Sequence, residues 1–159
     1  YKTLEESRGT RGYPERFVAP PPAMVSWMLH GHLRRMLCAK LGIHDEGLSE
    51  DLFLVSDHGG YALGPHTDSP SKVLNVLFYL PADESTMHAG TSLYEPIEAG
   101  RTCPGGPHYP AADFREVKRV PFKPNSALIF AKSDTSFHGV ERFVGPGTRS
   151  LLLYSVYKQ

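Results

Sequence analysis

The stretch GPHTDSP, at residues 64–70, places a histidine and an aspartate one residue apart between two prolines. In an extended strand alternate side chains point to the same face, so His66 and Asp68 face one way and Thr67 faces the other. An imidazole beside a carboxylate can form a metal site, a catalytic pair or a polar contact at a strand end. The triplet alone does not decide among these three.

His138 is the third residue whose position suggests chemistry. It follows the apolar segment 126–131 and a short polar turn, and it opens another extended stretch. The chain then turns at 145–147 and returns as the apolar strand 149–157, so we expect a hairpin with His138 on one strand and Arg149 on the other. Arg149 either lies at a strand end in water or holds a buried anion, a task that suits its planar guanidinium.

Two histidines and one carboxylate form a facial triad, the ligand set of non-haem Fe(II) oxygenases, which leaves neighbouring coordination positions open. Two of these positions can take a chelating 2-oxo acid, and a third can take O2. The distal carboxylate of such a co-substrate needs a buried cation, and Arg149 is the candidate.

Four motifs carry a family resemblance: GPHTDSP, LFYLP, GTSLYEP and PNSALIFAKSDTSFHGVERFVGPGTRSLLLYSVY. In this order they resemble the Fe(II)/2-oxoglutarate-dependent dioxygenases, and most closely the prolyl-hydroxylase-like branch. The resemblance covers roughly residues 52–157. It implies a mainly β fold, the double-stranded β-helix or jelly roll, with one or more N-terminal helices packed on the outside.

The resemblance also implies roles for individual residues. His66, Asp68 and His138 match the iron ligands of the family. Arg149 matches the basic residue that binds the distal carboxylate of 2-oxoglutarate. Fe(II) is therefore the expected cofactor, with 2-oxoglutarate and O2 as co-substrates.

Two residues of the LFYLP strand are further candidates for co-substrate contact. Tyr79 matches a tyrosine that hydrogen-bonds the distal carboxylate in some family members; the alternative is a core aromatic residue. Asn75 precedes Tyr79 by four residues and shares its face on a regular strand.

Prolyl hydroxylases usually carry a tyrosine shortly before H-x-D, and Tyr61 is displaced from that position, which argues against peptidyl-proline as the substrate.

The implied reaction is hydroxylation of an unactivated C–H bond in a small metabolite or a peptide side chain, with release of succinate and CO2. Related halogenases have a small residue where Asp68 stands, so the carboxylate favours hydroxylation, while desaturation, cyclisation and demethylation stay open. Substrate contacts are expected from the N-terminal arm, the 97–112 loop and the pocket rim. The candidates are His58, His88, Arg101 and Tyr109.

Hydrophobic patterning predicts the elements that must position these residues. Residues 23–42 have apolar side chains at helical spacing, so we expect one helix that packs on a sheet. Several short strands behind one helix predict a β-sandwich, jelly roll or barrel. The expected strands are 51–57, 61–68, 72–81, 91–96, 114–122, 126–132 and 149–157.

We expect a single domain over 1–159, with an N-terminal arm at 1–22, the helix at 23–42 and the jelly-roll core at 51–157. The segment 97–112 is rich in glycine and proline. A loop of this length is either a lid over a functional site or a disordered excursion.

The amino-acid composition limits the classes of partner that we expect the protein to bind. The 159 residues include 17 basic and 17 acidic side chains, so no strong field attracts nucleic acid or an anionic membrane. We therefore expect a small-molecule or peptide substrate. The chain has no run of eighteen apolar residues, no secretory signal and two cysteines without a C-x-x-C pair, which predicts a cytoplasmic protein with free thiols. The sequence begins at Tyr1 and not at a methionine, so the possibility that it is a fragment of a longer protein stays open.

Two other interpretations compete with the oxygenase. Zinc also accepts two histidines and a carboxylate, with water completing a hydrolytic site on a similar barrel. That interpretation gives Arg149 no role. A non-catalytic jelly-roll sensor of metal or 2-oxo acid is the second alternative, and the complete set of ligands and the arginine argue against it.

Overall fold

The computed structural model describes residues 17–18, 20, 22–28, 30–144 and 147–159. The predicted arm at 1–22 therefore falls largely outside the described residues. Its described part contains the short strand β1 (Phe17–Val18), which pairs antiparallel with β2 (Leu48–His58).

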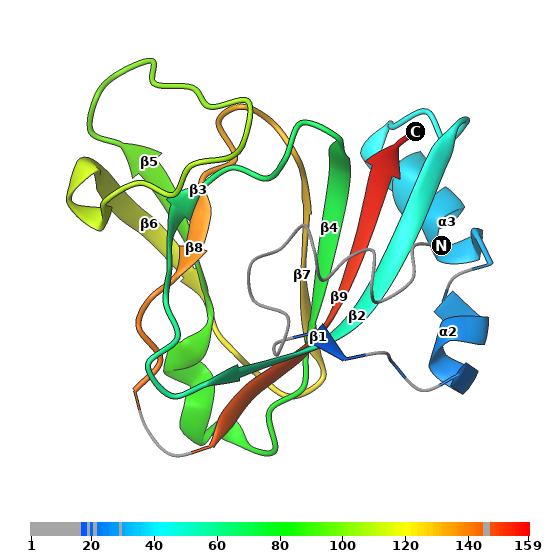
Figure 1. The fold of residues 1–159 in the computed structure, drawn as a ribbon, viewed down its shortest axis with the longest axis horizontal. Helices are drawn as coiled ribbons and strands as arrows, with labels where there is room; N and C mark the ends of the chain where they lie inside the picture. Colours follow the sequence, from blue (N-terminus) through cyan, green and yellow to red (C-terminus); the bar gives the residue numbers. More distant parts are fainter. Residues whose placement is uncertain (1–16, 19, 21, 29, 145–146) are drawn as a thin grey trace.

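Within the described residues, the strands form two antiparallel sheets, on the left and right of Figure 1. The larger sheet has the order β1-β2-β9-β4-β7, and the smaller has the order β3-β8-β5-β6. This arrangement confirms the predicted mainly β jelly roll. The larger sheet contains, besides β1 and β2, the strands β4 (Lys72–Tyr79), β7 (Ser126–Ala131) and β9 (Thr148–Lys158). The smaller sheet contains β3 (Leu63–His66), β5 (Thr91–Pro96), β6 (Phe114–Val120) and β8 (His138–Val140). Two short 3-10 segments are η2 (Glu84–Ala89) and η3 (Ala111–Asp113).

Side chains alternate between the two faces of the larger sheet, and this alternation divides the core. On β4, Leu74 and Val76 join a cluster that includes buried residues of the helices. Asn75 and Leu77, between and beyond them, line a cavity on the opposite face. Polar residues on this inner face are therefore positioned for a site between the sheets, while the outer face is sealed by apolar contacts.

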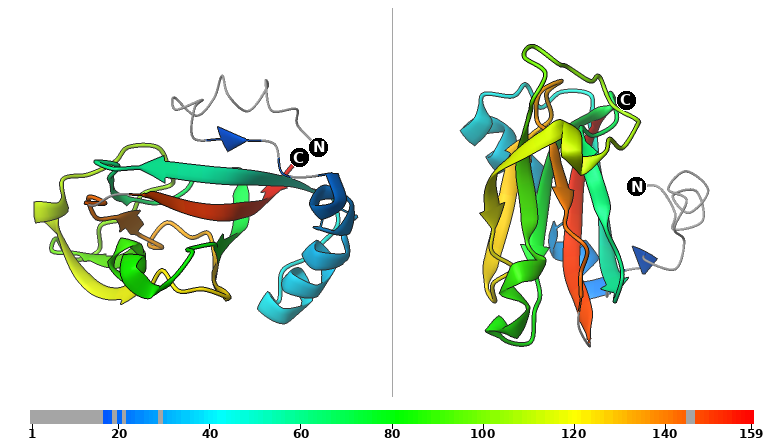
Figure 2. Two further views of the ribbon diagram at one scale, coloured as in Figure 1. Left: turned by 90° about the horizontal axis from the view of Figure 1, so that it is seen from below. Right: turned by 90° about the vertical axis from the view of Figure 1, so that its left-hand side faces the viewer.

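Two helices, and not one, cover the outer face of the larger sheet (Figures 1 and 2): α2 (Pro22–Met28) and α3 (His32–Leu41). The single helix predicted over 23–42 is interrupted before α3 at Gly31, whose φ of 70° is left-handed. The Gly31 N–H donates to Glu50 Oε1 at 2.8 Å, so the break ties the helical segment to β2. Neither of the described helices has the length and apolar character needed to cross a lipid bilayer.

The predicted hairpin that joins His138 to Arg149 is wrong. His138 lies on β8 in the smaller sheet, and Arg149 lies on β9 in the larger one. The connecting chain therefore crosses from one sheet to the other. Apolar character predicted β9, and the extended stretch expected to begin at His138 is β8, but neither pattern predicted which sheet the strand would join.

Candidate metal centre

His66 and His138 come from neighbouring strands of the smaller sheet. They are direct partners in the antiparallel pair β3–β8, and their ring centroids lie 4.4 Å apart. Both are buried. The close approach of the two strands depends on Gly139, where a Cβ would lie 2.4 Å from the carbonyl oxygen of Leu63. Strand pairing thus brings together two histidines that are far apart in the sequence.

Each imidazole is held through one ring nitrogen by the backbone just before it. His66 Nδ1 donates to the carbonyl of Gly64 at 3.0 Å, and His138 Nδ1 donates to the carbonyl of Ser136 at 3.0 Å. Because a carbonyl can only accept, the proton sits on Nδ1 and the lone pair on Nε2 in both rings. A hydrogen bond from the second ring nitrogen is the usual support for a metal-binding histidine.

The electrostatic surroundings keep both rings neutral. Burial, followed by the neighbouring His138, lowers the pKa of His66 to about 4. Burial also lowers the pKa of His138, although the nearby Asp68 opposes this shift. Neutral imidazole is the form that ligates a metal ion.

Asp68 follows β3 and has both carboxylate oxygens engaged. Lys72 Nζ donates to Oδ1 at 2.8 Å, and the side-chain amide of Asn75 donates to Oδ2 at 2.5 Å. Burial alone would raise the pKa of Asp68, but Lys72 and His138 outweigh it and the pKa lies below its usual value. Thr67 points the other way, as the alternation predicts, and donates to the carbonyl of Cys103 at 2.7 Å.

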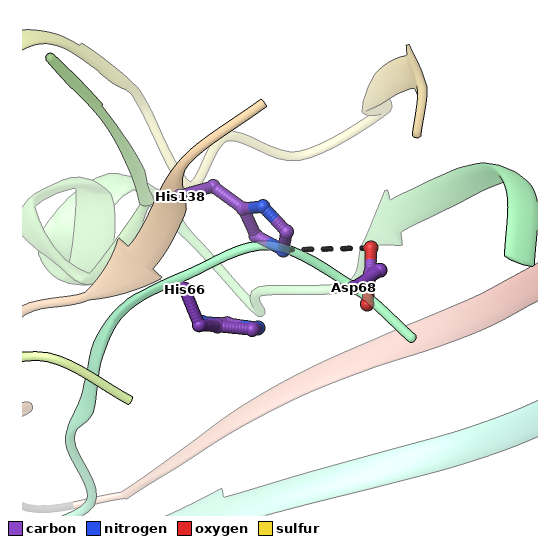
Figure 3. A group of neighbouring side chains, drawn as sticks. All are labelled: His66, Asp68 and His138. Carbon is purple, nitrogen blue, oxygen red and sulfur yellow. Dashed lines mark ion pairs between the residues drawn. The ribbon is translucent and has the colours of Figure 1, made fainter. Parts of the chain in front are cut away.

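The three side chains converge on one space (Figure 3), with His138 Nε2 3.7 Å from Asp68 Oδ2. One ligand atom from each of His66, Asp68 and His138 lies within 4.8 Å of the other two. An ion bound at about 2.0–2.2 Å needs ligand atoms about 3–4 Å apart, so small side-chain movements close the site. Two imidazoles and a carboxylate, each with outer hydrogen bonds in place, fit a divalent transition metal.

The predicted triad lines a cavity of about 220 Å³ between the sheets, together with Asn75 and Arg149. Tyr79, the remaining predicted co-substrate contact, does not line this cavity. Its hydroxyl donates to Thr91 Oγ1 at 2.9 Å, and Thr91 does line the cavity. The structure therefore places Tyr79 one hydrogen bond away from the site.

Arg149 lies on the inner face of β9 with 1% of its surface exposed. Its Nη1 donates to Asp57 Oδ2 at 2.8 Å, and its Nε donates to the carbonyl of Ala89 at 2.6 Å. Nη2 makes a longer contact of 3.4 Å to Thr91 Oγ1. Arg149 is therefore buried and does not lie at a strand end in water. The anion that it holds is the carboxylate of Asp57.

Several residues of the site were missed by the sequence analysis. Lys72 and Thr91 stand at the first positions of predicted strands, where a polar residue gives no signal of its own. His108 lies in turn-like sequence that gives no signal of a role, yet it lines the cavity and its ring centroid is 4.7 Å from that of His66. Tyr61 also lines the cavity, despite its displacement from the family position.

The 97–112 segment packs back on the H-x-D motif. Tyr109 N–H donates to the carbonyl of Pro65 at 2.9 Å, and the carbonyl of Cys103 accepts from Thr67. At Gly105 a Cβ would lie 2.3 Å from the carbonyl oxygen of Asp68. These contacts, and His108 in the cavity wall, place the segment over the triad and do not support an excursion without a structural role.

The four weaker candidates for substrate contact lie outside the cavity wall. His58 is exposed at the end of β2, and the ring of His88 stacks near Phe143. The guanidinium of Arg101 lies over the ring of Tyr109, 5.5 Å from its centroid. Their part in substrate binding stays a prediction.

No protein-family model and no curated protein sequence matches the chain. Among solved structures, it is similar to a prolyl-4-hydroxylase from Pseudomonas putida, with a TM-score of 0.56 and 16% identity over 98% of this chain and 79% of that one. It is also similar to HygX from Streptomyces hygroscopicus, solved with nickel and 2-oxoglutarate bound, with a TM-score of 0.57 and 12% identity over 98% and 77%. A third is the epimerase SnoN, in complex with Fe3+, alpha-ketoglutarate and nogalamycin RO, with a TM-score of 0.55 and 13% identity over 98% and 72%.

These likenesses confirm that the chain has the fold implied by its sequence motifs. At identities of 12% to 16% they concern the fold. What the site of this chain can do rests on its own residues and their geometry.

Proposed function

We propose that the chain is an Fe(II)- and 2-oxoglutarate-dependent oxygenase that hydroxylates an unactivated C–H bond of a small metabolite or a peptide side chain. One observation carries this proposal. Two buried histidines, each tied back through Nδ1, present Nε2 beside Asp68 in the same cavity that Arg149 lines. A metal triad and a buried arginine in one cavity match the two ends of a chelating 2-oxo dicarboxylic acid.

In this proposal different residues of the chain bind the metal and the co-substrate. His66, His138 and Asp68 hold Fe(II), while Lys72 and Asn75 keep the Asp68 carboxylate in place. Iron, 2-oxoglutarate and O2 together supply an oxidation that yields succinate and CO2 and oxidises the substrate C–H bond.

The distal carboxylate of 2-oxoglutarate binds at Arg149 and Thr91, and Tyr79 orients the Thr91 hydroxyl. Apolar side chains from the larger sheet, among them Leu77 and Leu151, form the wall along which the co-substrate lies. This wall excludes water from the reacting centre.

The size of the cavity bears on the substrate. Its volume of about 220 Å³ is below the roughly 300–1,000 Å³ of pockets that enclose a drug-sized ligand. The co-substrate therefore fills much of it, and the reacting group of the substrate enters beside His108 while the rest stays at the rim. The balance of basic and acidic side chains favours a small molecule or a peptide over a nucleic acid or a membrane surface.

The test is an anaerobic titration of the Fe(II)-loaded protein with 2-oxoglutarate, following the weak visible absorption of a 2-oxo acid chelated to iron. We expect the band in the wild-type protein and its loss in His66→Ala and His138→Ala, whereas Asp68→Gly should lose hydroxylation. Arg149→Lys keeps the charge but loses the planar fork, so half-saturation should move to an about tenfold higher 2-oxoglutarate concentration.

Three results would contradict parts of the proposal. Iron binding without the band removes the co-substrate and favours a zinc hydrolase, which hydrolytic activity of the zinc-loaded protein then tests. A band without succinate release in the presence of O2 and candidate substrates favours a sensor. Epimerisation, the activity in the name of SnoN, would replace hydroxylation as the proposed reaction and would leave the proposed use of 2-oxoglutarate unchanged.

A further inference from the structure

The buried arginine of the cavity already has a partner of opposite charge. Asp57 and Arg149 are direct cross-strand neighbours on β2 and β9, and their side chains pair at 2.8 Å. Asp57 is fully buried and Arg149 is 1% exposed. Water therefore screens neither charge, and their attraction is stronger than that of an exposed pair.

Arg149 keeps donors for a ligand in spite of this pair. Three of its five N–H groups point at Asp57, the carbonyl of Ala89 and Thr91. The ring of Phe122 packs against the guanidinium, 5.3 Å from its centre. Arg149 lines the cavity and Asp57 does not, so a ligand in the cavity meets the guanidinium and not the Asp57 carboxylate.

The charges at this end of the cavity decide which ligands it favours. With Asp57 ionised, the charges of Asp57 and Arg149 sum to zero. Adding the distal carboxylate of a ligand then leaves the three buried groups with a net charge of −1. With a neutral residue at position 57, Arg149 is an unpaired buried cation that the same carboxylate neutralises. A buried charge is costly when it lacks a partner. The distal carboxylate therefore adds an unpaired charge in the first case and removes one in the second.

We propose that Asp57 is a specificity-determining residue: by neutralising Arg149, it reduces the preference of the cavity for dicarboxylic over monocarboxylic 2-oxo acids. This inference rests on the proposed function, because it assumes that a 2-oxo acid binds at the triad. A five-carbon 2-oxo acid without a distal carboxylate should then bind this protein better than it binds a site with an unpaired arginine.

The test compares two ligands by calorimetry on Ni(II)-loaded protein, which binds without turnover. The ligands are 2-oxoglutarate and 2-oxopentanoate, and the readout is the ratio of their dissociation constants. We expect Asp57→Asn to raise the preference for 2-oxoglutarate by at least about tenfold relative to wild type, because the carboxylate then meets an uncompensated cation.

Glu50→Gln is the matched control. It removes one buried carboxylate from the same strand, but from the face that packs on the helices, where Glu50 accepts hydrogen bonds from Tyr154 and Gly31. The change in net charge is the same and the cavity is untouched. The preference should therefore equal that of the wild-type protein.

Each result decides the question. An unchanged or reduced preference in Asp57→Asn overturns the inference, because Asp57 then only orients Arg149. If Asp57→Asn does not fold, the wild-type protein decides: we expect a preference below about 100-fold, whereas a site built around an unpaired donor rejects the analogue by 10⁴–10⁵, so a larger preference overturns the inference. Binding of neither ligand by the nickel-loaded wild type contradicts the proposed function itself.

Discussion

His66 and His138 face each other across β3 and β8, with ring centroids 4.4 Å apart and each Nδ1 donating to a backbone carbonyl two residues earlier. The pairing fixes the spacing of the rings, and the two hydrogen bonds fix the nitrogen that each ring presents. The site is therefore pre-organised by backbone geometry, which makes the effect of losing one ring predictable.

Replacing either histidine with alanine should abolish metal binding while the chain stays folded. A facial triad with one ligand missing holds its ion weakly, and we expect affinity for Ni(II) or Fe(II) to fall by more than about 100-fold, since outer hydrogen bonds alone are worth 10–100-fold. Calorimetry with Ni(II) and circular dichroism measure the two properties. His44→Ala, at an exposed residue between α3 and β2, is the control and should bind as wild type does. Wild-type affinity in His66→Ala would remove that residue from the ligand set.

Asn75 links the metal centre to the larger sheet. Its amide nitrogen donates to Asp68 Oδ2, and its oxygen accepts from Ser155 at 2.5 Å. Asn75→Ala should weaken metal binding by about 10–100-fold, because Asp68 loses the group that orients it. Ser155→Ala removes a contact one step further from the metal and should have a smaller effect on affinity. Equal losses in the two variants would mean that both act through general destabilisation, which urea unfolding would detect.

Local sequence patterns predicted much of this site because alternation acts over a few residues. The strand expected at 91–96 is β5, Thr91–Pro96, and His66 and Asp68 share a face while Thr67 is turned away. Asn75 reaches the cavity for the same reason. For Asn75 the period of β4 decides the direction of the side chain, whereas Thr67 and Asp68 lie just past the end of β3 and keep the alternation expected of a strand.

Features that depend on long-range pairing were not predictable in this way. The sheet that β8 joins, and the partner of Arg149, depend on register between strands far apart in the chain. Asp57 lies in the strand expected at 51–57, but nothing local indicates that it meets Arg149. The break at Gly31 depends likewise on its contact with Glu50, which supports a left-handed residue inside an otherwise helical pattern.

The metal-free protein should lose stability as the pH falls from about 6.5 to about 4. His66 has a pKa of about 4 in the folded chain and 6.5 as its reference value. Between these values the unfolded chain binds more protons than the folded one, so protonation favours unfolding. His66 alone should lower the free energy of unfolding by about 2 kcal/mol between pH 7 and pH 5. Asp68 has a lowered pKa, so its contribution is lost at still lower pH and does not cancel this trend.

Urea unfolding of the metal-free protein at pH 7 and pH 5 measures this difference. His66→Gln cannot be protonated in this range and should show a flatter pH dependence. Saturating Ni(II) should raise the stability at both pH values without removing the difference between them, because the loss comes from proton uptake by the unfolded chain. An identical pH dependence in His66→Gln would show that other groups dominate the window.

The 97–112 segment should contribute to the metal centre through its contact at Gly105. Gly105 and Gly106 both have positive φ, 132° and 120°, so alanine strains the backbone at either position. At Gly105 the added Cβ would lie 2.3 Å from the carbonyl oxygen of Asp68, whereas at Gly106 nothing lies within 4 Å. Gly105→Ala should therefore lose about 1–3 kcal/mol more stability than Gly106→Ala, the usual range for overpacking. It should also weaken Ni(II) binding, because Asp68 must move away from the loop. Equal stability and equal Ni(II) affinity in the two variants would show that the segment lies over the triad without positioning it.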